Sequence, residues 1–270
     1  VLNVSADHMD RYADIQAYQR AKLAVYQGAE NIVINRSDPL TRPLLANHVK
    51  WWSFGLDAPH ENAFGIVQQG TRALLAFEDQ ALMPLTELRL PGRHNVQNAL
   101  AALAIGKAAG LPFDAMLEEL RSFEGLPHRC EWVAEIGGVQ FINDSKGTNV
   151  GATVAAIEGL GVPPGRRLVL IAGGQGKGAD FSALRTSVQQ HVHGAVLIGA
   201  DAKLIDKEIN SVTDTCFALD LPAAVQAACA MARPGDSVLF SPACASFDMY
   251  SGFEQRGQAF IQAVRAQGEA

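Results

Sequence analysis

The stretch VQFINDSKGTNVGATVAAIEGL, residues 139–160, holds the pattern that decides the fold. A short run at 139–142 predicts a strand, apolar residues at helical spacing over 150–160 predict a helix, and the polar residues between them predict a strand-to-helix corner. The alternation continues to the end of the chain, with strands expected at 167–172, 195–198, 216–219 and 237–240 and helices at 181–192, 202–209, 223–232 and 253–266. This order is typical of an α/β fold, a parallel sheet with helices on both faces.

The first part of the chain has a different pattern. A helix is expected at 15–27 and a strand at 31–38, followed by short alternating runs around Trp51, 64–68, 72–77 and 82–88 that predict a small mixed or antiparallel sheet. Two helices are expected next, at 95–110 and 112–123, with Gly110 ending the first and Pro112 opening the second. Glycine and proline in EGLPH, residues 124–128, place a domain boundary there, so we expect two domains, 1–125 and 126–270.

Composition excludes several classes of protein. Of the 270 residues, 48% are hydrophobic and 19% charged, as in soluble globular proteins. The net charge of -6 and the lack of a basic run argue against a nucleic-acid partner. The four cysteines have no C-x-x-C spacing, which argues against a disulfide framework or a zinc site. No apolar run is long enough to cross a membrane and no signal peptide is evident, so we expect a cytoplasmic protein without a membrane partner.

Three polar corners are candidate binding sites: NDSKGTN at 143–149, GGQGKGAD at 173–180 and SPACASFD at 241–248. Ligands of parallel α/β sheets bind at the carboxyl ends of the strands, beside the amino termini of the helices. Each corner taken alone is also explained by helix capping. Lys146 and Lys177, however, lie where a cation opposes the helix dipole, which favours an anionic ligand held by both.

The loop GGQGKG does not match the common phosphate-binding motifs. Alignment of Gly176 and Lys177 to a Walker A loop puts Ile171 at the first glycine and Gly178 at the metal-binding hydroxyl. As a dinucleotide fingerprint it has Ala179 at the last glycine position and no evident acidic partner. The loop is therefore at most a weak nucleotide signal.

The first part of the chain offers three further candidates, each with an alternative. His8 between two aspartates in DHMDRY is either a divalent-metal ligand or a surface histidine. Lys22 lies in the amphipathic helix expected at 15–27, and its spacing alone indicates an ordinary solvent-exposed lysine. Asn95 and Asn98 lie on one side of a helix, either as a cap and an exposed polar residue or as amides that recognise a purine.

Seven ordered segments together resemble the Mur ligase family. They are LNVSADHMDRY (2–12), AKLAVY (21–26), GRHNVQNALAAL (92–103), GLPHRCEW (125–132), FINDSKGTNVGAT (141–153), AGGQGKGADF (172–181) and SPACASFDMYSGFEQRG (241–257). The resemblance implies that 1–125 is the C-terminal portion of the central ATP-binding domain, and that 126–270 is the Rossmann-like C-terminal domain that binds the incoming amino acid. It also implies that the chain lacks the UDP-sugar domain and the P-loop, so we expect this fragment to be inactive alone.

The activity that the resemblance implies is an ATP-dependent amide ligation in peptidoglycan precursor synthesis. D-glutamate would be added to UDP-N-acetylmuramoyl-L-alanine through an acyl phosphate, by a monomer that uses ATP and Mg²⁺. Two alternatives stay open: a folylpolyglutamate synthase-like ligase, which shares the architecture, and a non-catalytic module that binds nucleotide or amino acid.

The resemblance also implies roles for single residues. The residues implied for catalysis are Lys22, Lys146 and His8, with His8 and a carbamylated Lys22 at the metal. The residues implied to bind ATP are Asn98, His128, Arg129 and Asp144. The residues implied to bind D-glutamate are Thr148, Lys177, Ser246, Phe247 and Phe253. The sequence departs from residues common in the family at Gly147, Gln175 and Phe247.

Overall fold

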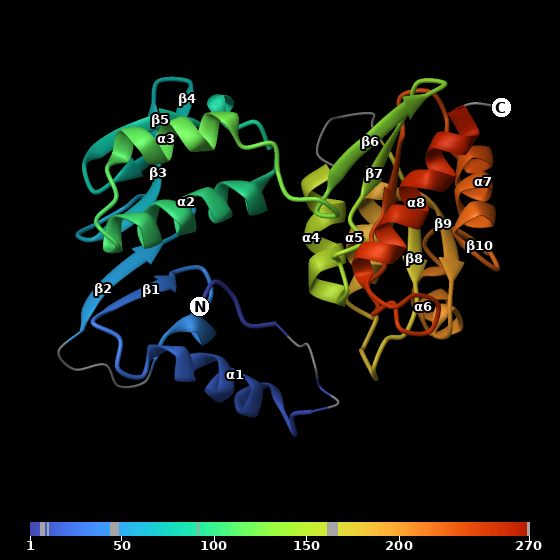
Figure 1. The fold of residues 1–270 in the computed structure, drawn as a ribbon, viewed down its shortest axis with the longest axis horizontal. Helices are drawn as coiled ribbons and strands as arrows, with labels where there is room; N and C mark the ends of the chain where they lie inside the picture. Colours follow the sequence, from blue (N-terminus) through green and yellow to red (C-terminus); the bar gives the residue numbers. More distant parts are fainter. Residues whose placement is uncertain (6–8, 10, 44–48, 91, 161–166, 269–270) are drawn as a thin grey trace. The chain divides into compact units, whose positions relative to one another are not determined.

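The chain divides into two compact units, Val1–Glu124 and Gly125–Ala270, one residue before the boundary expected from the sequence (Figure 1). The computed structural model describes residues 1–5, 9, 11–43, 49–90, 92–160 and 167–268. Each unit has its own sheet and its own hydrophobic core.

The first unit is built on a five-stranded mixed sheet, as expected. Its strands are β1 (Asn31–Asn35), β2 (Lys50–Phe54), β3 (Ala63–Gln69), β4 (Arg72–Phe77) and β5 (Gln80–Pro84), in that spatial order. Strands β1 to β3 are parallel, and β3 to β5 form an antiparallel meander. Short 3₁₀ turns lie at Pro39–Thr41 (η2) and Leu85–Glu87 (η3).

Two helices, α2 (Arg93–Ala108) and α3 (Phe113–Ser122), cover this sheet, and α2 buries Leu100 and Leu103 against Phe64 and Leu75. Gly110 follows α2 with φ of +83°, the left-handed conformation expected of a residue that ends a helix. The α-helix expected at 15–27 is shorter: α1 (Ile15–Leu23) gives way to the 3₁₀ turn η1 (Ala24–Tyr26), because the chain turns at Gly28 with φ of +75°.

The second unit contains a six-stranded sheet in the order β10-β9-β8-β11-β7-β6 (Figure 1). Its strands are β6 (Glu131–Ile136), β7 (Val139–Asn143), β8 (Leu168–Gly173), β9 (Val192–Ile198), β10 (Asp214–Phe217) and β11 (Ser237–Phe240). The five strands β7 to β11 are parallel, which confirms the expected α/β fold.

Strand β6 was not expected from the sequence. It pairs antiparallel with β7 at the edge of the sheet and contains no fully buried residue, and its apolar run, at 132–134, is only three residues long. The signal that could have identified it is the pair Gly137 and Gly138, both with positive φ, which form a two-residue hairpin turn.

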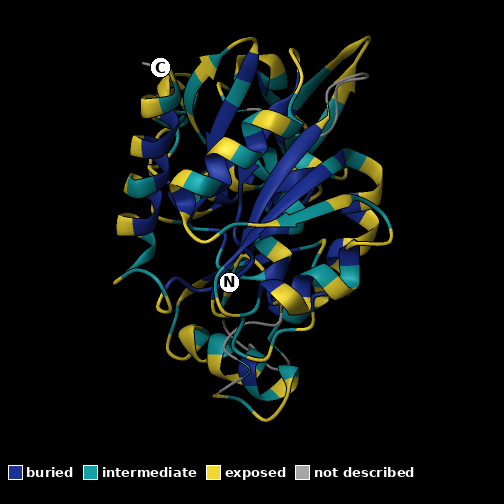
Figure 2. Ribbon diagram, turned by 90° about the vertical axis from the view of Figure 1, so that its right-hand side faces the viewer, coloured by how far each residue is buried: buried dark blue, intermediate teal, exposed yellow. Residues whose placement is uncertain are grey.

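Helices cover both faces of this sheet: α4 (Val150–Leu160), α5 (Leu184–His191) and α6 (Ala202–Ile209) on one face, α7 (Leu221–Met231) and α8 (Phe253–Gly268) on the other. Alternate strand residues supply the two cores; Leu168 and Leu170 belong to the first, Val169 and Ile171 to the second. Figure 2 shows the central strands of this unit in the dark blue of buried residues. In the part of the chain that the structure describes, no helix is both long and apolar enough to span a bilayer.

Candidate active site

The strand order brings the three polar corners together. The corners follow β7, β8 and β11, and because β11 lies between the other two, their carboxyl ends are adjacent at one edge of the sheet. Backbone hydrogen bonds then join the loops: Ala243 N donates to Gly147 O at 2.8 Å, and Gln175 and Ala245 exchange two bonds of 3.0 and 2.9 Å. Residues from distant parts of the sequence therefore form one connected surface.

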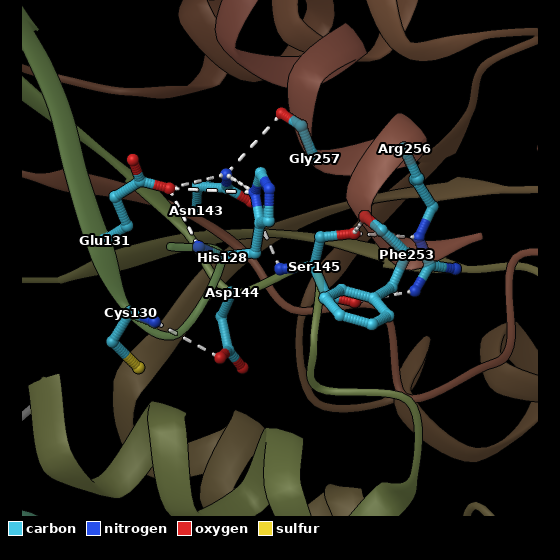
Figure 3. A network of polar contacts seen from close by, with 9 residues as sticks. All are labelled: His128, Cys130, Glu131, Asn143, Asp144, Ser145, Phe253, Arg256 and Gly257. Atoms are coloured by element: carbon cyan, nitrogen blue, oxygen red, sulfur yellow. Dashed lines mark hydrogen bonds and ion pairs between the residues drawn. The ribbon is translucent and has the colours of Figure 1, made fainter. Parts of the chain in front are cut away.

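A buried arginine, which we did not single out from the sequence, ties two of these loops to α8. Arg256 is 1% exposed, and its guanidinium donates to Ser145 Oγ (3.1 Å) and Ser145 O (2.9 Å) (Figure 3). It also donates to Cys244 O (3.1 Å). Burial lowers the pKa of Arg256 to about 10, so the side chain still carries its charge at neutral pH. The only signal in the sequence was its place in the segment SGFEQRG.

Lys146 and Phe253 lie against each other at this edge. The Lys146 ammonium is 3.9 Å from the centroid of the Phe253 ring, a cation–π contact, and both side chains are half-buried. The ring of Phe253 also lies near His128, whose imidazole centroid is 6.1 Å away in an edge-on arrangement. The backbone N–H of Lys146 also donates to His128 O at 3.0 Å.

Asp144 points into the protein. Its carboxylate accepts hydrogen bonds from Ser241 Oγ at 2.6 Å and from Cys130 N at 3.3 Å, and the residue is 7% exposed. Burial raises the pKa of Asp144 to about 6, because the charged form loses its hydration. A Cβ at Gly147 would lie 2.5 Å from this carboxylate and 2.6 Å from Ser241 Oγ, so a larger residue there would force one of these side chains to shift.

The loop after β8 carries Lys177 in a left-handed conformation, with φ of +54°. The carboxylate of Asp201 fixes this loop by accepting a hydrogen bond from Gly176 N at 2.7 Å. The Lys177 ammonium lies 5.8 Å from the ring centroid of Phe247, a large aromatic side chain that is 66% exposed. Next to Phe247, Ser246 is buried.

The remaining residues singled out in the second unit are Thr148 and Arg129. Thr148 is half-buried in the loop after β7, where its N–H donates to Lys146 O at 2.8 Å. Arg129 is exposed, directly after His128. Asn149 caps α4, since its side chain accepts from Ala152 N at 2.9 Å.

In the first unit, Lys22 lies on α1, half-buried, with its ammonium 4.9 Å from the ring centroid of Tyr18. Asn98 is exposed on α2. His8 lies outside the described residues. Among the residues with described positions, no group of three or more His, Cys, Asp or Glu side chains is arranged to hold a metal ion.

This edge of the second unit has the chemistry of an anion-binding site. Two half-buried ammonium groups, those of Lys146 and Lys177, lie on loops that one buried guanidinium and several backbone hydrogen bonds hold in place. Partly buried cations bind carboxylate or phosphate more strongly than solvated ones. Each ammonium lies against an aromatic ring.

Two family models match this chain: the Mur ligase middle domain over residues 1–106, and the glutamate ligase domain of Mur ligases over residues 128–244. Among curated relatives, the UDP-N-acetylmuramoylalanine–D-glutamate ligases of Pseudomonas savastanoi pv. phaseolicola and Pseudomonas aeruginosa are each 52% identical over 264 residues, 98% of this chain. The chain spans 59% of the length of these relatives.

The fold is shared with solved structures of low sequence identity. MurF from Acinetobacter baumannii superimposes with a TM-score of 0.72 at 19% identity, over 97% of this chain and 58% of that one. At that identity the likeness concerns the fold alone.

Proposed function

Because the chain belongs to the Mur ligase family, we propose that it is the part of an ATP-dependent amide ligase that holds nucleotide and D-glutamate. The ligase joins D-glutamate to UDP-N-acetylmuramoyl-L-alanine during peptidoglycan precursor synthesis, in the cytoplasm and as a monomer. The observation that carries the proposal is the pair of half-buried lysines, Lys146 and Lys177, on neighbouring loops of one sheet edge. The 52% identity to relatives named as D-glutamate ligases favours this substrate over that of a folylpolyglutamate synthase-like ligase.

The reaction proceeds in two steps. A carboxylate oxygen of UDP-N-acetylmuramoyl-L-alanine attacks the γ-phosphorus of ATP, ADP leaves, and an acyl phosphate forms. The neutral amine of D-glutamate then attacks the acyl carbon, the tetrahedral intermediate collapses, and phosphate leaves with the former carboxylate oxygen as the amine loses a proton. Catalysis of such steps consists mainly of positioning and of stabilising negative charge.

Lys146 is the residue that we assign to that charge. Its ammonium stabilises the negative charge of the phosphoryl group and of the tetrahedral intermediate. The contact with Phe253 supports this role, because it restricts a long side chain to one direction without neutralising it.

D-glutamate carries two carboxylates and a short chain of methylene groups. The second unit offers cations for the carboxylates and apolar surface for the methylene groups. We assign Lys177 to one carboxylate, with Thr148 and Ser246 as hydrogen-bond donors. Phe247 and Phe253 then pack against the methylene groups of the amino acid. The fixed position of the Lys177 loop, held by Asp201, supports a site that is formed before the amino acid binds.

ATP is assigned to Asn98 in the first unit and to His128, Arg129 and Asp144 in the second. Mg²⁺, when bound, would neutralise part of the phosphate charge, and we assign it to His8 and a carbamylated Lys22. Mg²⁺ keeps several waters and binds phosphate oxygens, so one or two protein ligands suffice for it.

The proposal is tested by product formation in a full-length ligase that contains this chain. We expect ATP, UDP-N-acetylmuramoyl-L-alanine and D-glutamate to give one new amide, detected by mass spectrometry, and L-glutamate to give none. Product only with a pterin substrate would favour the folylpolyglutamate synthase-like alternative. Binding of D-glutamate without product would favour the non-catalytic module, and loss of that binding in Lys177→Ala would still place the amino acid at this edge.

A further inference from the structure

Asn143, the last residue of β7, lies at the centre of a buried polar network (Figure 3). The residue is 0% exposed, and its side chain approaches groups from three other segments: His128, Glu131 and Gly257. A buried amide must satisfy its oxygen and its NH₂ group with partners of the right kind. The partners therefore determine which way the amide points.

The amide can take only one orientation. Its oxygen accepts a hydrogen bond from Ser145 N at 3.1 Å, and its NH₂ group donates to Glu131 Oε2 at 3.1 Å. Rotation by 180° would place the amide oxygen against a carboxylate and the NH₂ group against an N–H. Gly257 O, 3.5 Å from Nδ2, opposes the rotated form as well.

This orientation determines the proton position on His128. The ring nitrogen Nδ1 lies 2.9 Å from Asn143 Nδ2, which is a donor, so Nδ1 must accept. An accepting ring nitrogen carries no proton, and the imidazole is then neutral with its proton on Nε2.

Glu131 does not compete for Nδ1. Its Oε2 is 3.7 Å from His128 Nδ1, beyond hydrogen-bond range, and it accepts instead from His128 N at 2.9 Å. Glu131 thus fixes the backbone of His128 and the amide of Asn143, while Asn143, alone among the residues that the structure describes, forms a hydrogen bond with Nδ1 of the ring.

The ring is also held in place by its packing. A Cβ at Gly257 would lie 2.3 Å from Nδ1, so α8 approaches the ring as closely as a glycine allows. On another side is the ring of Phe253. The backbone of His128 adopts φ of +64°, which is uncommon for a residue other than glycine. A ring turned by 180° would put Cδ2 where Nδ1 now lies and would lose its bond to Asn143.

We propose that Asn143 is a positioning residue that keeps His128 neutral, with its proton on Nε2, so that Nε2–H donates a hydrogen bond to an acceptor atom of ATP. The ATP contact rests on the proposed function, whereas the tautomer follows from the hydrogen bonds alone. The network thereby links the nucleotide to Ser145, the residue before Lys146, through a single side chain.

The tautomer is measured by ¹⁵N NMR of the imidazole in a full-length ligase with ¹⁵N-labelled histidine, the signal being assigned by its loss in His128→Gln. We expect Nδ1 to show the shift of an unprotonated nitrogen and Nε2 that of a protonated one. A proton on Nδ1 in the unaltered protein would overturn the proposal, and this measurement depends on no variant and no substrate.

Asn143→Asp tests whether the amide of Asn143 determines the tautomer of His128. A carboxylate accepts where the amide donated, so Nδ1 should become protonated and the KM for ATP should rise about tenfold, with a smaller change in kcat. The matched control is Gln140→Glu, an amide-to-acid change on the same strand, where Gln140 forms an exposed hydrogen bond with Glu135 of β6, and it should leave both the tautomer and the KM unchanged. An unprotonated Nδ1 in folded Asn143→Asp would contradict the role of Asn143.

If Asn143→Asp does not fold, Glu131→Gln provides a second test of what sets the tautomer. It removes the charge but leaves Asn143 in place, so the expected tautomer is unchanged; a proton on Nδ1 in this variant would show that Glu131, and not Asn143, sets the tautomer. The outcomes are separable from those of the proposed function: absence of D-glutamate ligation would leave the tautomer result standing. If the unaltered protein has the Nε2–H tautomer, and folded Asn143→Asp protonates Nδ1 but leaves the KM for ATP unaltered, only the ATP contact is overturned.

Discussion

Arg256 donates two hydrogen bonds to Ser145, one to its hydroxyl and one to its carbonyl oxygen, and both residues are buried. Ser145 Oγ in turn donates to Phe253 O at 2.8 Å. The loop that carries Lys146 is therefore attached to the first turn of α8 by side chains rather than by a sheet or helix ladder.

Replacement of this arginine by lysine should destabilise the second unit. Lysine keeps the charge but cannot reach Ser145 and Cys244 with a planar fork, so Arg256→Lys leaves buried carbonyl groups unsatisfied, at a cost of about 2–3 kcal/mol. Urea denaturation measures the loss. Arg265→Lys, an exposed change on the same helix, is the control and should cost under about 0.5 kcal/mol. Equal stability of the two variants would contradict the account of Arg256.

Lys146→Ala should separate activity from stability. The ammonium contacts the ring of Phe253, and loss of this cation–π contact should cost about 1 kcal/mol or less in the free energy of unfolding. Turnover of a full-length ligase should fall by at least about a hundredfold, because removal of one charge-stabilising group typically has that effect. Lys203→Ala, at an exposed lysine on α6, should leave turnover unchanged. Turnover near that of the unaltered enzyme in Lys146→Ala would remove this lysine from the mechanism.

Much of the second unit could be predicted from its sequence, because βα alternation is a local pattern. The strands from β7 to β11 and their helices were found within a few residues, and the three polar corners were recognised as candidates. The order of the strands is not local. That β11 lies between β7 and β8, and so joins the three corners, depends on long-range pairing that no single segment encodes.

The residues that hold the corners together were missed for a related reason. Arg256 lies within a helix pattern and Asn143 ends a strand pattern, and the local sequence does not predict that either side chain is buried. Burial of a polar group is decided by the segments that pack over it. The inward carboxylate of Asp144 likewise depends on Ser241, almost a hundred residues later in the chain.

The stability of the protein should depend on pH through Asp144. Its pKa is about 6 in the folded protein against an ordinary value of 3.8, so the folded state binds more protons between these values and stability falls as pH rises from about 4 to 6. This pKa difference makes the free energy of unfolding about 3 kcal/mol lower at pH 7 than at low pH. Asp144→Asn should remove this part of the pH dependence. Urea denaturation of both proteins from pH 4 to 7 gives the comparison, and a stability difference that is constant across that range would contradict the buried carboxylate.

Gly147→Ala should act through the same carboxylate. The new methyl group would collide with Asp144 Oδ2 and Ser241 Oγ, and we expect a cost of about 1–3 kcal/mol. In an Asp144→Ala background the nearest atom is gone, so the second substitution should cost clearly less. Costs that simply add, as measured by a double-mutant cycle, would show that the two positions do not interact.

The central claim, that this chain serves a ligase with an acyl-phosphate intermediate, is tested most directly by the fate of one oxygen. UDP-N-acetylmuramoyl-L-alanine labelled with ¹⁸O in its carboxylate is incubated with ATP, D-glutamate and a full-length ligase that contains this chain, and the released phosphate is analysed by mass spectrometry. The account predicts one ¹⁸O atom in each phosphate released with amide product. Unlabelled phosphate, or release of phosphate that does not depend on D-glutamate, would contradict it.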